Sequence, residues 1–219
     1  MKRLFDAICW DHDGLLVDTE SLFFTTTRDI LRTAGVNLSL EHWSREYLSR
    51  GLGTAAVAEG LGVPVTDSPA LVAIRNRMYR ESLEQSPPLC RGASDTLRRL
   101  HGKLPMALVT GSQREDIELV HRSTGLLTLF ETIVARADYD QPKPAPDPYL
   151  EAARRLGIEP VRCLAVEDSE RGLRAAIAAG MRCVVVPSEL TRGQKFIGAG
   201  AIESCVDRVP SHVFDFSAG

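Results

Sequence analysis

Short apolar segments recur along the chain, and charged residues, glycine or proline bound each of them. Segments this short with such boundaries are typical of buried strands. We predict strands at Ala7–Trp10, Met106–Val109, Thr132–Ala135, Cys163–Val166 and Cys183–Val186. Their apolar positions are continuous rather than alternating with polar ones, so we expect burial on both faces, as in a parallel sheet.

Helical periodicity fills the intervals around the last four strands. Helices are predicted at Ser94–His101, Arg114–Ser123, Pro148–Leu156 and Arg171–Ala179. Gly125, Gly157 and Gly180 follow three of them, where a glycine commonly ends a helix. Strands that alternate with helices predict an α/β fold built on a Rossmann-like parallel sheet.

The interval between the first two strands, roughly residues 20–88, is too long for one crossover helix. It contains its own helical patterns at Ser21–Ala34, Leu40–Leu48, Thr54–Leu61 and Pro69–Leu83. These helices either join the layer of crossover helices or form a cap over the sheet edge. Asp13-Gly14 and Pro87-Pro88 resemble two adjacent hinge strands, which favours the cap. We therefore predict a catalytic core of residues 1–16 and 89–219 and an inserted all-helical cap of residues 17–88.

Composition places the chain among ordinary globular proteins. Its 219 residues are 44% hydrophobic and 25% charged, with a formal net charge of −3, so neither a nucleic-acid nor a membrane partner is expected. Arg75, Arg77 and Arg80 are interpreted as one solvated helix face. The N-terminus does not resemble a signal peptide, and no segment has the length of a membrane span. A monomer is the default expectation.

The five cysteines are odd in number, widely spaced and never in a Cys-x-x-Cys pair. Cys9, Cys163 and Cys183 fall in predicted strands, so we interpret them as reduced core residues. Reduced cysteines favour a cytoplasmic protein.

Polar residues follow three predicted strands. Asp11 and Asp13 follow the first, Thr110-Gly111-Ser112 follows the second, and Glu167-Asp168 follows the fourth. Open parallel sheets bind ligands at the carboxyl ends of their strands, so these residues are expected at one edge.

Each polar group taken alone is more often a helix cap than a catalyst. Ser112 could cap the helix that begins at Arg114, and Asp168 or Ser169 the helix that begins at Arg171. Four carboxylates at two strand ends exceed the needs of capping, and they repel one another unless a cation is present. Mg²⁺ suits such oxygen ligands and shares them readily with phosphate.

A lysine supplies a further positive charge. Lys143 lies in the loop Gln141–Pro148, after the third strand, where four prolines stiffen the backbone. It is expected to reach the same sheet edge, where Asp11, Thr110 and Mg²⁺ would complete a phosphoryl-binding site.

These parts, in this order, resemble the haloacid dehalogenase superfamily. The resemblance is to its helical-cap branch of phosphatases and β-phosphoglucomutase-like phosphomutases, and it covers nearly the whole chain. It rests on the segment Asp11-His12-Asp13-Gly14, then Thr110, Lys143 and Glu167-Asp168. The four parts together are far more specific than Asp-x-Asp-Gly alone.

The resemblance implies a role for each carboxylate. Asp11 would attack phosphorus and form an aspartyl phosphate, while Asp13 would act as general acid and then as general base. Mg²⁺ would be held by the Asp11 side chain, the Asp13 backbone carbonyl and Asp168. Glu167 would lie nearer the metal or in its outer shell.

The resemblance also implies the phosphate-binding groups. Thr110 and the Gly111 amide would hold phosphoryl oxygens, and Lys143 would neutralise charge on them and on Asp11. Gly111 departs from the more usual Asn or Ser, which removes a side-chain contact. His12 is also atypical and is interpreted as a bystander on the far side of the turn.

Three alternatives to a phosphatase follow from the family. Dehalogenase members lack the second aspartate, so Asp13 argues against them. Sugar-phosphate mutases carry a His near the position of Phe23-Phe24 and an anchoring Arg near that of Thr54, although Arg50 could still contact substrate from the cap. A non-catalytic phospho-ligand-binding protein would be expected to lose a core residue. We therefore predict a Mg²⁺-dependent hydrolase, a phosphatase acting on a small phosphorylated metabolite.

Overall fold

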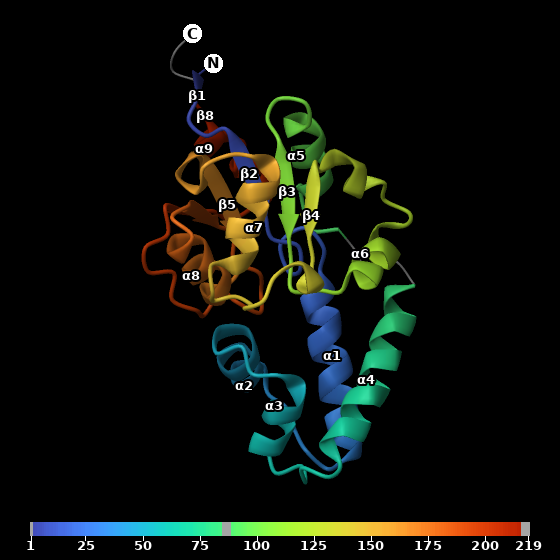
Figure 1. Ribbon diagram of the computed structural model, residues 1–219. Coiled ribbons are helices and arrows are strands. Elements are labelled where there is room, and N and C mark those ends of the chain that lie inside the picture. The colour runs from blue at the N-terminus through green and yellow to red at the C-terminus, as the bar shows by residue number, and fades with distance from the viewer. Residues whose placement is uncertain (1, 85–88, 216–219) are drawn as a thin grey trace.

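A six-stranded parallel sheet forms the centre of the larger part of the molecule (Figure 1). The structure is a computed structural model, and it describes residues 2–84 and 89–215. The strand order is β4-β3-β2-β5-β6-β7. The strands are β2 (Ala7–Trp10), β3 (Met106–Val109), β4 (Thr132–Val134), β5 (Cys163–Glu167), β6 (Arg182–Val185) and β7 (Ala201–Ile202). The predicted α/β parallel sheet is confirmed, and only the two-residue β7 lacked a sequence signal.

Helices cover both faces of the sheet. One face of β2 and β3 packs on α5 (Ala93–Leu100) and α6 (Arg114–His121). The other face packs on α7 (Asp147–Leu156) and α8 (Glu170–Ala178). Every residue of β2, β3 and β5 is buried, which explains their continuous apolar sequences.

The remaining core elements are short. They are the 3-10 helices η2 (Leu126–Leu129), η3 (Arg136–Asp138), η4 (Pro160–Arg162) and η5 (Val206–Arg208), with α9 (Pro210–Val213). At the end of the molecule far from the cap, β1 (Lys2–Arg3) pairs antiparallel with β8 (Phe214–Asp215) (Figure 1).

Between β2 and β3 the chain forms a separate helical layer at the carboxyl ends of the strands (Figure 1). Its long helices α1 (Thr19–Thr33) and α4 (Ser68–Leu83) pack on one another, beside α2 (Leu40–Trp43), the π-helical η1 (Ser44–Ser49) and α3 (Thr54–Gly60). These helices have their own apolar cluster around Leu31, Trp43 and Val57. The helical insertion is therefore confirmed, and we call it the cap.

The boundaries between core and cap stay a prediction. Val17 forms an isolated antiparallel bridge with Leu89, so the two connecting segments run beside each other. Pro87 and Pro88, the other half of the predicted hinge, lie outside the described residues.

The solvated face predicted for three arginines of α4 is wrong. Successive residues turn by about 100° around a helix, so Arg75 and Arg77 point in nearly opposite directions. Arg75 is only 4% exposed, lies 3.9 Å from the centroid of the Phe23 ring, and donates a hydrogen bond of 2.9 Å to the Thr54 hydroxyl. Arg80 instead forms an ion pair with Asp116 of the core.

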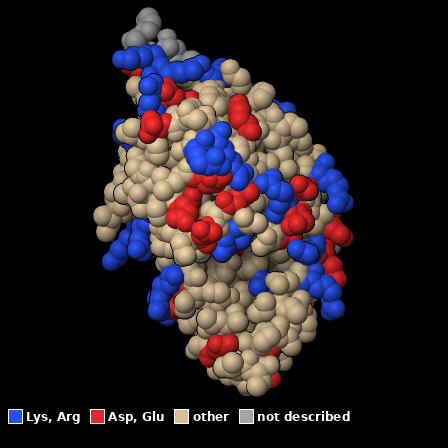
Figure 2. Space-filling model, in the orientation of Figure 1, with Lys and Arg blue, Asp and Glu red and all other residues tan. Residues whose placement is uncertain are grey.

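Surface charge and cysteines agree with the composition. On the face shown in Figure 2, acidic and basic side chains are intermixed over the core, and the far end of the cap is mostly uncharged. All five cysteines are free.

Within residues 2–84 and 89–215, no helix combines the length and apolar character needed to cross a bilayer.

Candidate active site

Asp11 and Lys143 meet at the carboxyl end of β2. The Asp11 amide donates to the Val166 carbonyl, which extends the strand pairing by one residue. The Lys143 ammonium, 7% exposed, donates to Asp11 Oδ1 at 2.6 Å and to the Val109 carbonyl at 3.1 Å. The structure thus brings Lys143 to the sheet edge predicted from its proline-rich loop.

Glu167 holds the other side of Lys143. Its Oε1 accepts hydrogen bonds of 2.6 Å from both Lys143 Nζ and the Tyr149 hydroxyl, and its Oε2 accepts one from Ser169 at 3.3 Å. Because both oxygens are already engaged, Glu167 is better suited to orienting Lys143 than to binding a metal directly.

Asp11, Glu167 and Asp168 form a buried acidic cluster. One carboxylate oxygen from each lies within 4.8 Å of the others. Burial, followed by repulsion from Glu167, raises the pKa of Asp11 to about 7. Burial, followed by repulsion from Asp11, raises the pKa of Asp168 well above its usual value. Lys143 alone therefore does not balance the cluster, and a divalent cation bound to oxygens of Asp11 and Asp168 would fit it.

Two glycines allow the carboxylates to approach the backbone this closely. A Cβ atom at Gly14, where φ is +79°, would lie 2.5 Å from Asp168 Oδ2. A Cβ atom at Gly172, in the first turn of α8, would lie 1.9 Å from the Glu167 carboxyl carbon. Side chains at these positions would displace the acidic cluster.

Asp13 lies apart from the acidic cluster and accepts three hydroxyl hydrogen bonds. Thr19 donates to its Oδ1 at 2.5 Å, while Thr110 and Ser112 donate to its Oδ2 at 2.7 and 2.8 Å. Burial alone would raise the pKa of Asp13, but His12 and these hydrogen bonds outweigh it and hold the pKa well below its usual value. The Asp13 side chain is therefore ionised in this arrangement.

Of the two serines considered as helix caps, one is a cap and the other is not. Ser169 caps α8, since its hydroxyl accepts a hydrogen bond from the Gly172 amide at 3.1 Å. Ser112 does not cap α6, whose N-cap residue is Gln113. Its hydroxyl turns to Asp13, and its amide donates to the Thr110 hydroxyl. The phosphoryl contact of Thr110 stays a prediction, because its hydroxyl is directed to Asp13 here.

His12 contacts Asp13 but lines neither of the two cavities described below, so its interpretation as a bystander stays a prediction. Its Nδ1 is 3.1 Å from Asp13 Oδ1, and its Nε2 is 2.9 Å from Nε2 of His121 on α6. His121 in turn contacts the Thr124 hydroxyl at 2.8 Å. Sequence reasoning missed this pair because the two histidines are 109 positions apart.

A cavity of about 280 Å³ lies between these groups and the cap. From the core it is lined by Asp11, Asp13, Gly111, Lys143 and Asp168, all predicted site residues. Sequence reasoning missed three further charged residues of the lining, which are Glu20, Arg136 and Arg171. No motif marks them. Glu20 lies on α1 of the cap, whereas Arg136 lies on η3 and Arg171 in the first turn of α8, both in the core.

The structure does not bring Arg50 into this cavity. Its guanidinium lies 2.5 Å from the Glu46 carboxylate one helical turn away, and its side chain is largely exposed. Arg50 is not among the residues that line the cavity in the described parts of the chain. The substrate contact expected of Arg50 therefore stays a prediction without support from this geometry.

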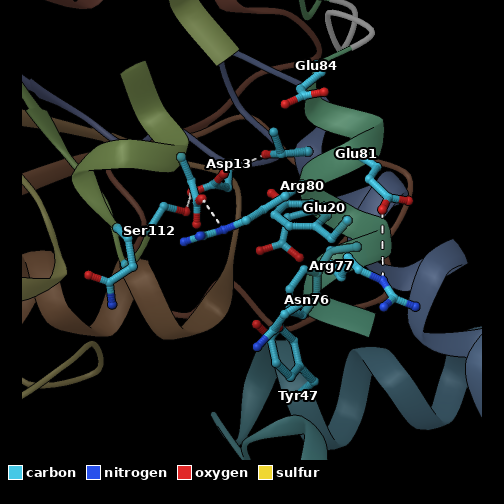
Figure 3. A pocket seen from close by; sticks show the side chains of 15 residues that line it. Asp13, Glu20, Tyr47, Asn76, Arg77, Arg80, Glu81, Glu84 and Ser112 are labelled. Carbon is cyan, nitrogen blue, oxygen red and sulfur yellow. Dashed lines mark hydrogen bonds and ion pairs between the residues drawn. The ribbon is translucent and has the colours of Figure 1, made fainter. Parts of the chain in front are cut away.

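A larger cavity of about 770 Å³ shares part of its lining with the smaller one (Figure 3). Asp13, Glu20, Tyr47, Gly111 and Ser112 line both cavities. Arg80 reaches from α4 across this space, and its Nε lies 3.0 Å from Asp116 Oδ1 on α6 (Figure 3).

The parallel sheet with helices on both faces, the helical insertion after β2 and the cluster of Asp11, Lys143, Glu167 and Asp168 are the features of a class of α/β hydrolases. A family model described as haloacid dehalogenase-like hydrolase matches residues 8–186. The chain belongs to this family, and its site is that of a phosphoric monoester hydrolase.

The chain has curated relatives of similar length. Protein CbbY of Rhodobacter capsulatus is 32% identical over 207 residues, which cover 88% of this chain and 90% of that protein. Fructose-1-phosphate phosphatase YqaB of Escherichia coli is 31% identical over 194 residues, covering 85% and 98%. A crystal structure of CbbY from Rhodobacter sphaeroides with xylulose-(1,5)bisphosphate superposes with a TM-score of 0.76 at 25% identity, covering 93% and 96%.

Proposed function

We propose that this protein is a Mg²⁺-dependent phosphatase that hydrolyses a small phosphorylated metabolite through an aspartyl-phosphate intermediate. The observation that carries the proposal is the Asp11 carboxylate, buried at a cavity and fixed through Oδ1 by Lys143. Its other oxygen is left to attack phosphorus. Relatives that include a fructose-1-phosphate phosphatase support the same substrate class.

In the first step, Asp11 Oδ2 forms a bond to phosphorus as the bond to the leaving oxygen breaks. Lys143 would offset charge on the transferred phosphoryl group, and the Gly111 amide at the cavity wall would bind one of its oxygens. Asp13, when protonated, would give its proton to the leaving oxygen.

In the second step, water attacks the phosphorus of the aspartyl phosphate and releases inorganic phosphate and Asp11. This step needs a base, and the ionised Asp13 described above has the required form. Thr19, Thr110 and Ser112 would hold its carboxylate in one orientation at the border of the two cavities.

The residues present fit Mg²⁺. We propose that the side chains of Asp11 and Asp168 and the backbone carbonyl of Asp13 hold it, with Glu167 acting through Lys143. When bound, the metal would supply positive charge to the acidic cluster and to the phosphoryl oxygens.

Hydrolysis is preferred over the mutase reaction because nothing at Phe23 can return a phosphoryl group or move a proton. Its ring packs at 5.0 Å from Tyr79 and at 5.4 Å from Tyr47. Phe23 therefore packs within the cap and has no polar atom to offer.

The test is release of p-nitrophenol from p-nitrophenyl phosphate with Mg²⁺. Asp11→Asn is expected to lower kcat by about 10⁴-fold, as loss of a nucleophile does. Asp95→Asn, the same change on the exposed surface of α5, is the matched control and should keep the wild-type rate. Equal rates for wild type and Asp11→Asn would refute the assignment of the nucleophile.

A further inference from the structure

We propose that the 770 Å³ cavity holds the leaving group of the substrate and selects singly phosphorylated, hydroxyl-rich compounds over those with a second anionic group. This inference rests on the proposed function, in which Asp13 protonates the leaving oxygen. It narrows the substrate class from any small phosphorylated metabolite to neutral polyol or sugar monophosphates.

The position of Asp13 determines which cavity takes which part of the substrate. Asp11, Lys143 and Asp168 line only the smaller cavity, so the transferred phosphoryl group belongs there. Asp13 lines both cavities. A leaving oxygen bonded to a phosphoryl group in the smaller cavity and protonated by Asp13 therefore directs the rest of the substrate into the larger one.

Acidic residues outnumber basic ones around the larger cavity. Among the described residues its lining includes five acidic side chains and two basic ones, which are Asp13, Glu20, Glu81, Glu84 and Asp116 against Arg77 and Arg80. Burial raises the pKa of Glu20 to about 8, so the negative charge near pH 7 comes mainly from the other four. Clefts lined by one sign of charge repel ligands of that sign. A second phosphate or a carboxylate on the leaving group would therefore enter a negative potential.

Each arginine has a carboxylate beside it that offsets part of its charge. Arg80 is held by Asp116, with 3.0 Å between Nε and Oδ1. Arg77 lies 3.9 Å from Glu81 on the same helix and points away from the core (Figure 3). A bidentate grip on a second phosphate would have to compete with the carboxylate that stands beside each guanidinium.

The uncharged part of the lining suits hydroxyl groups on a carbon skeleton. The side chains of Asn76, Ser112 and Gln113 can each donate and accept hydrogen bonds. Phe23, Tyr47 and Tyr79 give an aromatic wall against which the C–H face of a sugar or polyol can pack. The CbbY crystal structure contains a bisphosphate, so the present chain is expected to differ from that relative in substrate charge.

Two pairs of substrates with matched skeletons test the selectivity. Fructose 1-phosphate is compared with fructose 1,6-bisphosphate, and glycerol 3-phosphate with 3-phosphoglycerate, by phosphate release in the presence of Mg²⁺. For the wild type, the neutral member of at least one pair should have a kcat/KM about tenfold higher or more, as expected for like charges a few ångströms apart.

Asp116→Asn tests the cause of the selectivity. It removes one negative charge and releases Arg80, so the kcat/KM ratio within the preferred pair should shift about three- to tenfold toward the anionic member. Glu118→Gln is the control, since Glu118 lies on the same helix, is exposed and does not line the cavity. Its ratio should equal that of the wild type.

The outcomes separate this inference from the proposed function. If p-nitrophenyl phosphate is hydrolysed but neither pair shows a preference for its neutral member, the inference is overturned and the proposed function stands. An unchanged ratio in Asp116→Asn, with native unfolding temperature, also overturns it. If the wild type does not hydrolyse p-nitrophenyl phosphate, the proposed function fails and the inference falls with it.

Discussion

The strand ends of the core and the facing wall of the cap hold their charges in different ways. At the strand ends, Lys143 is buried and contacts two carboxylates at 2.6 Å each. On α4 of the cap, Arg77 and Glu81 are 71% and 66% exposed and lie 3.9 Å apart. Solvent screens the second pair and not the first. The charged groups at the strand ends are therefore held rigidly by the sheet, whereas those of the cap wall are exposed and can be substituted at little cost in stability.

Lys143→Met should have the largest effect on the free energy of unfolding. It leaves Asp11 and Glu167 buried without their cation, and breaking a buried pair in this way costs about 3–5 kcal/mol. Urea unfolding monitored by circular dichroism measures the change. Arg77→Met, at the exposed cap pair, should cost less than about 0.5 kcal/mol, and equal losses for both variants would contradict the contrast between core and cap.

Mg²⁺ should stabilise the core by the next largest amount. At one hundred times its dissociation constant, a ligand of the native state adds about 2.7 kcal/mol. Without metal, Asp11 loses its proton near its usual pKa in the unfolded chain. In the folded chain it keeps the proton until the pH approaches its raised pKa of about 7. The folded state then binds more protons, so metal-free stability falls as pH rises across this interval.

The size of the metal effect should follow that pH dependence. Mg²⁺ takes the place of the proton, so its increase in melting temperature should be greater at pH 8 than at pH 5.5. Thermal unfolding with Mg²⁺ or EDTA at both pH values is the measurement. An equal increase at both pH values would contradict binding to the acidic cluster.

Substitution by alanine should lower the free energy of unfolding at Gly172 but not at Gly60. Gly172→Ala places a methyl group on the Glu167 carboxylate, and such overpacking costs about 1–3 kcal/mol. Gly60→Ala, at the end of α3 with no atom within 4 Å of the added Cβ, should leave stability unchanged or raise it by up to about 1 kcal/mol. If Gly60→Ala destabilised the protein and Gly172→Ala did not, the expected contrast between tight packing in the core and open space in the cap would be wrong.

Arg50→Ala should have the smallest effect. Glu46 keeps a second partner in Arg45 at 2.8 Å, so the loss of unfolding free energy should stay below about 0.5 kcal/mol. Because Arg50 does not line the cavity, kcat/KM on the preferred substrate should fall less than threefold, on the order of a weak distal contact. A tenfold fall in kcat/KM would support the contact between Arg50 and the substrate that the sequence suggested.

The sequence predicts what the sheet alone determines. Continuous apolar runs located five of the strands, and the polar residues after them marked Asp11, Lys143 and Asp168, because parallel strands end at one edge. The sequence could not predict Glu20, which reaches the cavity only through the packing of cap on core. For Arg75 the signal was misleading, since its charge indicated solvent while the Phe23 ring and Thr54 hydroxyl provide a buried place for it.

Thr19 is both the first residue of α1 and a hydrogen-bond donor to Asp13. The same helix continues through the cap and packs along α4. Any tilt of α1 relative to the sheet must therefore carry the Thr19 hydroxyl with it and change the hydrogen bonding of Asp13. The orientation of the cap and the hydrogen bonding of Asp13 are in this way mechanically coupled through one helix.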